Sequence, residues 1–331
     1  GGRAAVDGTR DELLHVQRGR GRDLSLPGTG PGCNAGASGL RRESRGQYDR
    51  ASSFASNPGL TMLGGSIVAI VTPMTEGGEV DFAAFERLLD WHLDAGTDGV
   101  VVVGTTGESP TVTEAETARL LRAAVERIGG RIPVIAGTGS NSTAIAVART
   151  RAACAAGVDA VLVVTPYYNK PTQEGLYRHY VAVADASSVP VILYNVPSRT
   201  VCDLLPETVA RLAAHPRIAG IKEATADLTR VKPLLAIRPG FVVLSGDDAT
   251  AREFIQLGGH GVISVTANVA PRLMHEMCVA AAAGEAALAR ELDGRLAGLH
   301  RELFVEANPI PAKWALARLG LIPPGLRLPL T

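Results

Sequence analysis

The chain has 331 residues, 46% of them hydrophobic and 20% charged, a composition typical of a globular protein with a sizeable core. Its 33 basic residues balance its 33 acidic ones, so charge gives no reason to expect a nucleic acid or an anionic membrane as partner. No apolar run approaches the roughly 18–20 residues of a membrane-spanning helix. The four cysteines, Cys33, Cys154, Cys202 and Cys278, are far apart and form no C-x-x-C pair. This spacing argues against a disulfide scaffold and a cysteine zinc site, and it favours a reducing, cytoplasmic compartment.

Residues 1–61 are rich in Gly, Arg and Ser and carry no sustained apolar period, so we expect a disordered N-terminal extension. The segment lacks the apolar core of a secretory signal, and its acidic residues argue against a plastid transit peptide. The chain opens with Gly1, and Met62 stands just before the first regular pattern. We therefore expect residues 1–61 to be dispensable or non-native sequence.

From residue 65, short apolar runs alternate with amphipathic stretches of helical period. The runs are apolar almost throughout, which is typical of parallel strands covered on both faces. There are eight of them, at 66–73, 99–106, 133–139, 160–166, 190–197, 218–224, 241–248 and 261–265. Eight strands, each followed by a helix, predict a (β/α)8 barrel, a TIM barrel, over residues 62–284. The alternative is a doubly wound open sheet, which usually has fewer strands and often a G-x-G-x-x-G turn that TPMTEGGEV does not match.

Local signals mark several helix ends. Thr113 and Glu116 have the spacing of a capping box, and Pro206 suits the first turn of a helix. After residue 284, two further helical stretches follow without strands. They predict a small C-terminal helical appendage over residues 285–331, which we expect to be truncated because the chain stops at GLRLPLT.

The chain has only four lysines, and Lys222 lies inside an apolar strand. Burial removes hydration from an ammonium group and so favours the neutral, nucleophilic amine. The alternative is that Lys222 snorkels to the rim or pairs with Glu223, although neighbours along a strand point to opposite faces. Lys170 lies in a loop, and Lys232 and Lys313 fall on helices, so these are poorer candidates.

Active-site residues of such barrels lie at the carboxyl ends of the strands. Tyr194 ends the strand before Lys222, so its phenol is either within reach of the amine or part of the core. Arg199 suits a carboxylate ligand, unless it is a solvated loop residue. The turn at 104–107 offers hydroxyls and N–H groups to a small anion. Together they indicate imine chemistry on a 2-oxo acid, by a Schiff-base aldolase or lyase.

Asp247 and Asp248 offer carboxylates for a divalent cation, which would indicate a metal-dependent aldolase instead. The chain has no H-E-x-x-H motif, and its seven histidines do not cluster at the predicted strand ends. We therefore expect structural roles for the two aspartates.

These residues lie in segments that resemble the dihydrodipicolinate synthase family of the N-acetylneuraminate-lyase-like superfamily, from about Met62 to Thr331. The matching segments are GSIVAIVTPM, GTTGES, IPVIAGTG, TPYYNKPTQEGLY, YNVPSRT, GIKEAT, LSGDDA, GGHGVISVTANV and FVEANPIPAKWA. YNVPSRT followed by GIKEAT favours the synthases over the sialate lyases and sugar-acid aldolases, which stay the alternative. The resemblance implies condensation of pyruvate with L-aspartate 4-semialdehyde in lysine and diaminopimelate biosynthesis, without cofactor or metal, by a homo-oligomer that is a dimer of dimers.

The resemblance also implies roles for single residues. Lys222 of GIKEAT would form the Schiff base, and Tyr194 of YNVP would donate and accept protons. Thr105 and Thr106 of GTTG would complete the proton relay with Tyr168 of TPYY, which in the family comes from the neighbouring subunit. The substrate-binding residues would be Thr106, Arg199, Gly246 and Ile263.

The chain departs from the family pattern at two places besides its C-terminus. Val201 replaces a frequent glycine, and we expect its side chain to narrow the loop beside Arg199. A second departure concerns the site at which bacterial relatives bind lysine as an inhibitor, which is matched here by Ser109, Asn141 and Tyr167. The family's histidine and glutamate positions in that site hold Glu114, Thr117 and Ile145. We therefore expect weak or no inhibition by lysine. A catalytically silent barrel is a further alternative, because of the shortened C-terminus.

Overall fold

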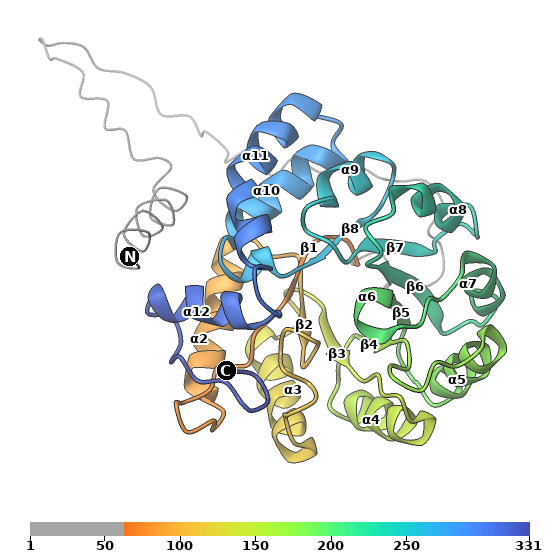
Figure 1. The fold of residues 1–331 in the computed structure, drawn as a ribbon, viewed down its shortest axis with the longest axis horizontal. Coiled ribbons are helices and arrows are strands. Elements are labelled where there is room, and N and C mark those ends of the chain that lie inside the picture. Colours follow the sequence, from red (N-terminus) through yellow and green to blue (C-terminus); the bar gives the residue numbers. More distant parts are fainter. Residues whose placement is uncertain (1–62) are drawn as a thin grey trace, which may run out of the picture. The chain divides into compact units, whose positions relative to one another are not determined.

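The structure, a computed structural model, describes residues 63–331, so the prediction for residues 1–61 lies outside the described residues. Eight parallel strands close into a barrel in sequential order, with helices around the outside (Figure 1). The strands are β1 (Gly65–Ala69), β2 (Gly99–Val102), β3 (Val134–Gly137), β4 (Ala160–Val164), β5 (Val191–Asn195), β6 (Ile218–Glu223), β7 (Val242–Ser245) and β8 (Gly261–Ser264). The TIM-barrel prediction is confirmed, and the open sheet is excluded because β1 pairs with β8 through Ile67 and Ile263.

Every predicted apolar run overlaps a strand, and each strand ends before its run does. The surplus residues after each strand form the loops at the carboxyl edge of the barrel. The barrel interior is closed by branched apolar side chains, which share one core cluster that includes Ile67, Ile135, Ile192, Leu244 and Ile263. Active-site residues of such barrels lie beyond this core, at the carboxyl edge of the strands.

Two helices around the barrel begin where local sequence signals indicate. Thr113 accepts a hydrogen bond from the Glu116 N–H, and Glu116 accepts one from the Thr113 N–H, so the capping box forms. Pro206 is the first residue of its helix. The helices are α2 (Phe82–Ala95), α3 (Glu114–Ile128), α4 (Thr143–Ala155), α5 (Gln173–Asp185), α6 (Pro197–Thr200), α7 (Pro206–Leu212), α8 (Val231–Leu235), α9 (Ala251–Gln256) and α10 (Pro271–Ala282), with 3-10 turns η1 (Leu228–Arg230) and η2 (Thr266–Asn268).

Two further helices follow the barrel, as predicted. They are α11 (Ala286–Glu302) and α12 (Ile310–Arg318), and the last residues continue beside α2 and α3 (Figure 1). Helix α12 packs through Pro311, Ala312, Lys313, Ala315 and Leu316, all of which are buried. Across residues 63–331, none of the helices combines the length and the apolar character needed to cross a membrane.

Candidate active site

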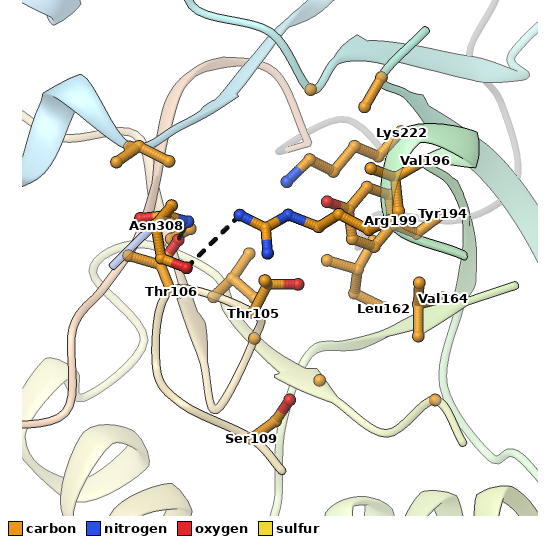
Figure 2. Close-up of a pocket in the computed structure, with 18 of the residues that line it drawn as sticks. Thr105, Thr106, Ser109, Leu162, Val164, Tyr194, Val196, Arg199, Lys222 and Asn308 are labelled. Carbon is orange, nitrogen blue, oxygen red and sulfur yellow. Dashed lines mark hydrogen bonds between the residues drawn. The ribbon is translucent and has the colours of Figure 1, made fainter. Parts of the chain in front are cut away.

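A cavity of about 270 Å³ opens at the carboxyl edge of the barrel. Most of its wall comes from strand ends and the loops that follow them, and Phe304 and Asn308 add a wall from the C-terminal segment. Figure 2 shows Lys222 and Arg199 pointing into the same space. The sequence-predicted residues that line it are Thr105, Thr106, Tyr194, Arg199, Lys222 and Gly246.

Lys222 lies near the end of β6 and is only 6% exposed. Within residues 63–331, no carboxylate lies within ion-pair distance of its Nζ atom. The Nζ atom instead lies 4.3 Å from the centroid of the Tyr194 ring, because Tyr194 and Lys222 are register partners in β5 and β6. Gly246 makes room for this side chain, since a Cβ atom there would lie 2.8 Å from Lys222 Cε. The alternative pairing of Lys222 with Glu223 does not occur.

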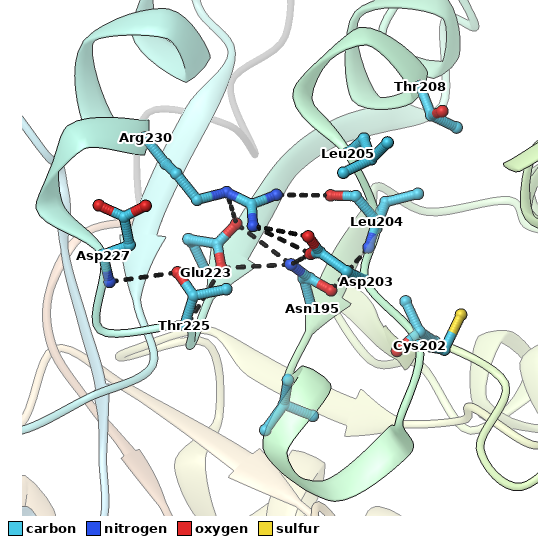
Figure 3. Close-up of polar contacts among 12 residues, drawn as sticks. Asn195, Cys202, Asp203, Leu204, Leu205, Thr208, Glu223, Thr225, Asp227 and Arg230 are labelled. Atoms are coloured by element: carbon cyan, nitrogen blue, oxygen red, sulfur yellow. Dashed lines mark hydrogen bonds and ion pairs between the residues drawn. The ribbon is translucent and has the colours of Figure 1, made fainter. Parts of the chain in front are cut away.

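The opposite face of β5 and β6 carries a polar network (Figure 3). Asn195 and Glu223, the residues after Tyr194 and Lys222, point away from the cavity and share a hydrogen bond of 3.3 Å. Arg230 lies 3.4 Å from Glu223 and also binds Asp203. Burial raises the pKa of the Glu223 carboxyl, and the positive charge of Arg230 opposes that rise. The network ties both strand ends to the segments beside them, which holds Tyr194 and Lys222 in register.

Arg199 reaches the cavity from α6, the short helix after β5. Its Nη2 atom donates to the Asn308 carbonyl oxygen at 3.4 Å, so the guanidinium spans from one side of the cavity to the other (Figure 2). Val201, which follows α6, takes a left-handed conformation at φ 54° and is 64% exposed. A β-branched residue is strained there, which explains why glycine suits this position.

The loop at 104–109 supplies hydroxyl groups to the cavity from Thr105, Thr106 and Ser109. Thr72, just beyond β1, donates to the Gly107 carbonyl at 2.7 Å and so fixes the inner side of the loop. Glu108 adopts φ 57°, a left-handed conformation that costs a non-glycine residue free energy. Such strain is kept only where the surrounding contacts hold it.

Two residues with predicted roles do not line the cavity of their own chain. Tyr168 is 87% exposed and has a left-handed φ of 76°. Ile263 lies deeper, fully buried in the barrel core. Both roles were implied by the family resemblance, and the cavity wall of a single chain includes neither residue.

The predicted effector residues lie on the same side of the barrel. Ser109 and Tyr167 line a second cavity of about 280 Å³, which adjoins the first and shares Arg199 and Asn308 with it. Asn141 lines neither cavity, and its carbonyl oxygen accepts a hydrogen bond from the Asn169 side chain at 2.8 Å.

Three further residues stand at the family's charged and imidazole positions of that site. Glu114 is ion-paired with Arg149 at 2.8 Å, and the Ile145 side chain is exposed. Thr117 lines a small recess with Ser109 and Glu114.

The aspartates after β7 make structural contacts. Asp247 accepts from the N–H and the hydroxyl of Thr250. Asp248 is buried and accepts from the N–H groups of Val265 and Thr266. In the described part of the chain, no three His, Cys, Asp or Glu side chains gather in a way that could hold a metal ion.

Sequence reasoning missed two contributions of the C-terminal segment. Asn308 lines the cavity and donates to Thr106 Oγ1 at 2.9 Å. Lys313, judged a poor candidate on a helix, is 1% exposed and pairs with buried Glu108 at 2.5 Å. Both residues lie in the matched segment FVEANPIPAKWA, but nothing in the sequence indicated which loop that segment would contact.

The barrel, the buried lysine and the guanidinium define a (β/α)8 barrel with a polar cavity at the carboxyl edge of its strands. Residues 62–331 match the model of the dihydrodipicolinate synthetase family. The 4-hydroxy-tetrahydrodipicolinate synthase of Thiobacillus denitrificans is 63% identical over 268 residues, covering 81% of this chain and 90% of that protein. That of Azoarcus sp. is 61% identical over 271 residues, covering 82% and 93%.

A solved structure gives the same result. The chloride-inhibited dihydrodipicolinate synthase from Acinetobacter baumannii, complexed with pyruvate, is 53% identical with a TM-score of 0.80, over 81% of this chain and 92% of that one. The chain therefore belongs to the dihydrodipicolinate synthetase family.

Proposed function

We propose that this protein is a 4-hydroxy-tetrahydrodipicolinate synthase, a lyase that condenses pyruvate with L-aspartate 4-semialdehyde in lysine and diaminopimelate biosynthesis. The observation that carries the proposal is the buried Lys222 amine, which lacks a carboxylate partner among the described residues and lies beside Tyr194 in the cavity. An amine held this way is free to act as a nucleophile, whereas a paired ammonium is not. Family membership and the names of the relatives support the same reaction.

In the proposed mechanism, the Lys222 Nζ atom attacks C2 of pyruvate, and water leaves to give an iminium. The positive nitrogen draws electrons from the methyl group, which loses a proton to form an enamine. The enamine carbon then bonds to the aldehyde carbon of the second substrate. The amine of that substrate finally attacks C2, closes the ring and displaces Lys222. No external oxidant, metal or cofactor is needed to balance these steps.

Each proton in this sequence needs a nearby donor or acceptor. We assign that role to Tyr194, with Thr105, Thr106 and the Tyr168 of a neighbouring subunit completing the relay. The binding groups would be Arg199 for the carboxylate of the second substrate, and Thr106, Gly246 and Ile263 for pyruvate. Support comes from the cavity, whose wall includes all of these residues except Tyr168 and Ile263.

The proposal includes an assembly and a location. A homotetramer, a dimer of dimers, would bring the exposed Tyr168 to the cavity of the next subunit. Residues 62–284 would form the catalytic barrel and residues 285–331 the helical appendage. A cytoplasmic location suits the free thiols Cys154, Cys202 and Cys278. Light scattering of the purified protein tests the assembly, and a stable, active monomer would contradict it.

We also propose that lysine inhibits the enzyme weakly or not at all. Ser109, Asn141 and Tyr167 of this chain match the site at which the inhibited relatives would bind lysine. Ile145, however, is an apolar residue at the position where a carboxylate would bind the amine of the effector. Titration of activity with lysine tests this directly. Strong inhibition by lysine at sub-millimolar concentration would contradict this proposal.

The function itself is tested by borohydride trapping. Purified protein is reduced in the presence of pyruvate and digested, and the adduct is mapped, with Lys222 as the expected position. Assays with pyruvate and different aldehydes then separate the synthase from the sugar-acid aldolase and N-acetylneuraminate lyase alternatives. Full activity in chelator is expected, and loss of activity would favour the metal-dependent alternative instead.

A further inference from the structure

The C-terminal segment after α11 contacts the loop at 104–109 at two points. Asn308 Nδ2 donates to Thr106 Oγ1 at 2.9 Å, and the Lys313 ammonium binds Glu108 Oε1 at 2.5 Å. All four residues are buried. The segment after α11 therefore holds the loop that supplies hydroxyl groups to the cavity.

The direction of the Asn308 hydrogen bond determines what Thr106 can do. A hydroxyl has one proton to donate, and here its oxygen accepts a hydrogen bond from the Asn308 amide. Among the described residues, Thr106 Oγ1 makes no other hydrogen bond. Its own proton is therefore free to be donated into the cavity that Thr106 lines.

Asn308 is itself held in place by its backbone and its neighbours. Its carbonyl oxygen accepts from Arg199 Nη2, and the next residue, Pro309, accepts from the Lys313 N–H at 2.9 Å. The ion pair between Lys313 and Glu108 then returns to the same loop that contains Thr106. This closed set of contacts fixes the amide against the hydroxyl.

The Asn308 amide also carries an unsatisfied group. Its Oδ1 atom is buried and has no hydrogen-bond partner among the described residues. An unpaired buried acceptor costs free energy that an apolar side chain of the same shape avoids. Packing alone would thus be served better by leucine, which indicates that the N–H group is the reason for asparagine.

We propose that Asn308 is a positioning residue for Thr106: by donating to Thr106 Oγ1 it turns the threonine proton toward the cavity. This inference rests on the proposed function, since Thr106 is assigned there both to the relay and to pyruvate binding. Asn308 would act through Thr106 without touching the reacting atoms.

Four variants test the inference in the full chain: Asn308→Asp, Asn308→Leu, Thr106→Val, and Asn308→Asp with Thr106→Val. Aspartate keeps the shape but accepts a hydrogen bond from Thr106, which turns the hydroxyl away from the cavity. We expect kcat to fall about 10²-fold, the usual scale for loss of one proton-transfer group, and KM for pyruvate to rise as well, because Thr106 is also assigned to pyruvate binding. The surface change Gln256→Glu on α9 is the matched control for amide to carboxylate.

The double variant separates positioning from structure. In the Thr106→Val background, Asn308→Asp should change kcat by less than about twofold, because the hydroxyl it orients is gone. Independent, multiplying effects would overturn the inference, as would a parent-like kcat in Asn308→Asp. Should the aspartate variant not fold, Asn308→Leu decides: it should keep the thermal midpoint and lose kcat to the same extent, and parent-like turnover would overturn the inference.

Borohydride trapping and deuterium exchange of the pyruvate methyl group are measured in parallel, without the aldehyde. If the parent protein shows neither trapping nor exchange, both the proposed function and the inference are contradicted. If the parent shows both and the Asn308 variants match it, only the inference is contradicted.

Discussion

Two lysines are buried at the carboxyl edge of the barrel, and only one of them has a carboxylate partner among the described residues. Lys313, from α12, is 1% exposed and pairs with the buried carboxylate of Glu108. Lys222, from β6, is 6% exposed and contacts the ring of Tyr194, with no carboxylate in ion-pair range among the described residues. Burial is therefore common to both, and the partner is what differs.

This comparison shows why burial alone does not identify a nucleophile. Burial lowers the pKa of the Lys313 amine, and the hydrogen bond and charge of Glu108 oppose that shift only in part. While its ammonium is bound to Glu108, Lys313 has no lone pair available for bond formation. The strands place Lys222 differently: the nearest carboxylate along the chain, Glu223, points to the opposite face and is satisfied by Arg230 and Asn195.

The largest effect is expected from Lys222→Ala. It removes the only amine that faces the cavity within residues 63–331, so trapping of pyruvate by borohydride should fall to background and condensation activity should be lost. The measurement is mass spectrometry of the reduced protein. Lys232→Ala, which removes an exposed lysine on α8, is the control and should trap pyruvate normally. A trapped adduct in Lys222→Ala would contradict the assignment of Lys222, and not Lys313, as the nucleophile.

Lys313→Met should instead reduce stability. It leaves the Glu108 carboxylate buried without its partner, which costs about 3–5 kcal/mol of unfolding free energy. Denaturant unfolding measures this loss. Adding Glu108→Gln removes the unpaired charge and should recover a good part of it. At a temperature where the variant is folded, it should still form the Lys222 adduct. Loss of trapping in the folded variant would contradict the separation of roles.

Tyr194→Phe tests the group beside the unpaired amine. It removes a hydroxyl at the cavity while keeping the ring that contacts Lys222, so kcat should fall about 10²-fold while pyruvate binding changes little. Steady-state kinetics measure both. Tyr180→Phe makes the same change on α5, where the hydroxyl donates to the Val163 carbonyl at 3.1 Å. It should cost about 1 kcal/mol of stability and leave kcat unchanged. Equal kinetic effects of the two changes would contradict the assignment.

Much of the fold was predictable because each strand and helix has a local signal. Eight apolar runs, the capping box at Thr113 and the proline at 206 depend on neighbours in the sequence, and each appears as predicted. Lys222 and Tyr194 could be placed at one edge because parallel strands have a fixed direction. Their lateral contact follows from the register of β5 and β6, which pairs Tyr194 with Lys222.

The contributions of the C-terminal segment could not be predicted in the same way. Asn308 lies 202 residues from Thr106, and Lys313 lies 205 residues from Glu108. No periodicity relates positions so far apart, and an asparagine before a proline is typical of any turn. Lys313 looked like a solvated helical residue because its partner is visible only in three dimensions.

The smallest effect is expected at the outer end of the same segment, where Arg327 forms two hydrogen bonds with Glu116. This contact holds the pKa of Glu116 at about 2, below its ordinary 4.5. A lowered folded-state pKa contributes stability above the unfolded value, and that stability is lost as the pH falls from about 4.5 to about 2.

Glu116→Gln keeps the capping box and removes the charge. It should therefore cost about 1–2 kcal/mol at pH 7, less than the full pKa shift implies because the pair remains partly in water. The cost should shrink as the pH is lowered through that range, as measured by urea unfolding. Glu207→Gln on α7 is the exposed control and should show little effect at any pH. A cost that stays constant down to pH 2 would mean that Glu116 stabilises this segment through shape and not through charge, unlike the buried pair at Lys313.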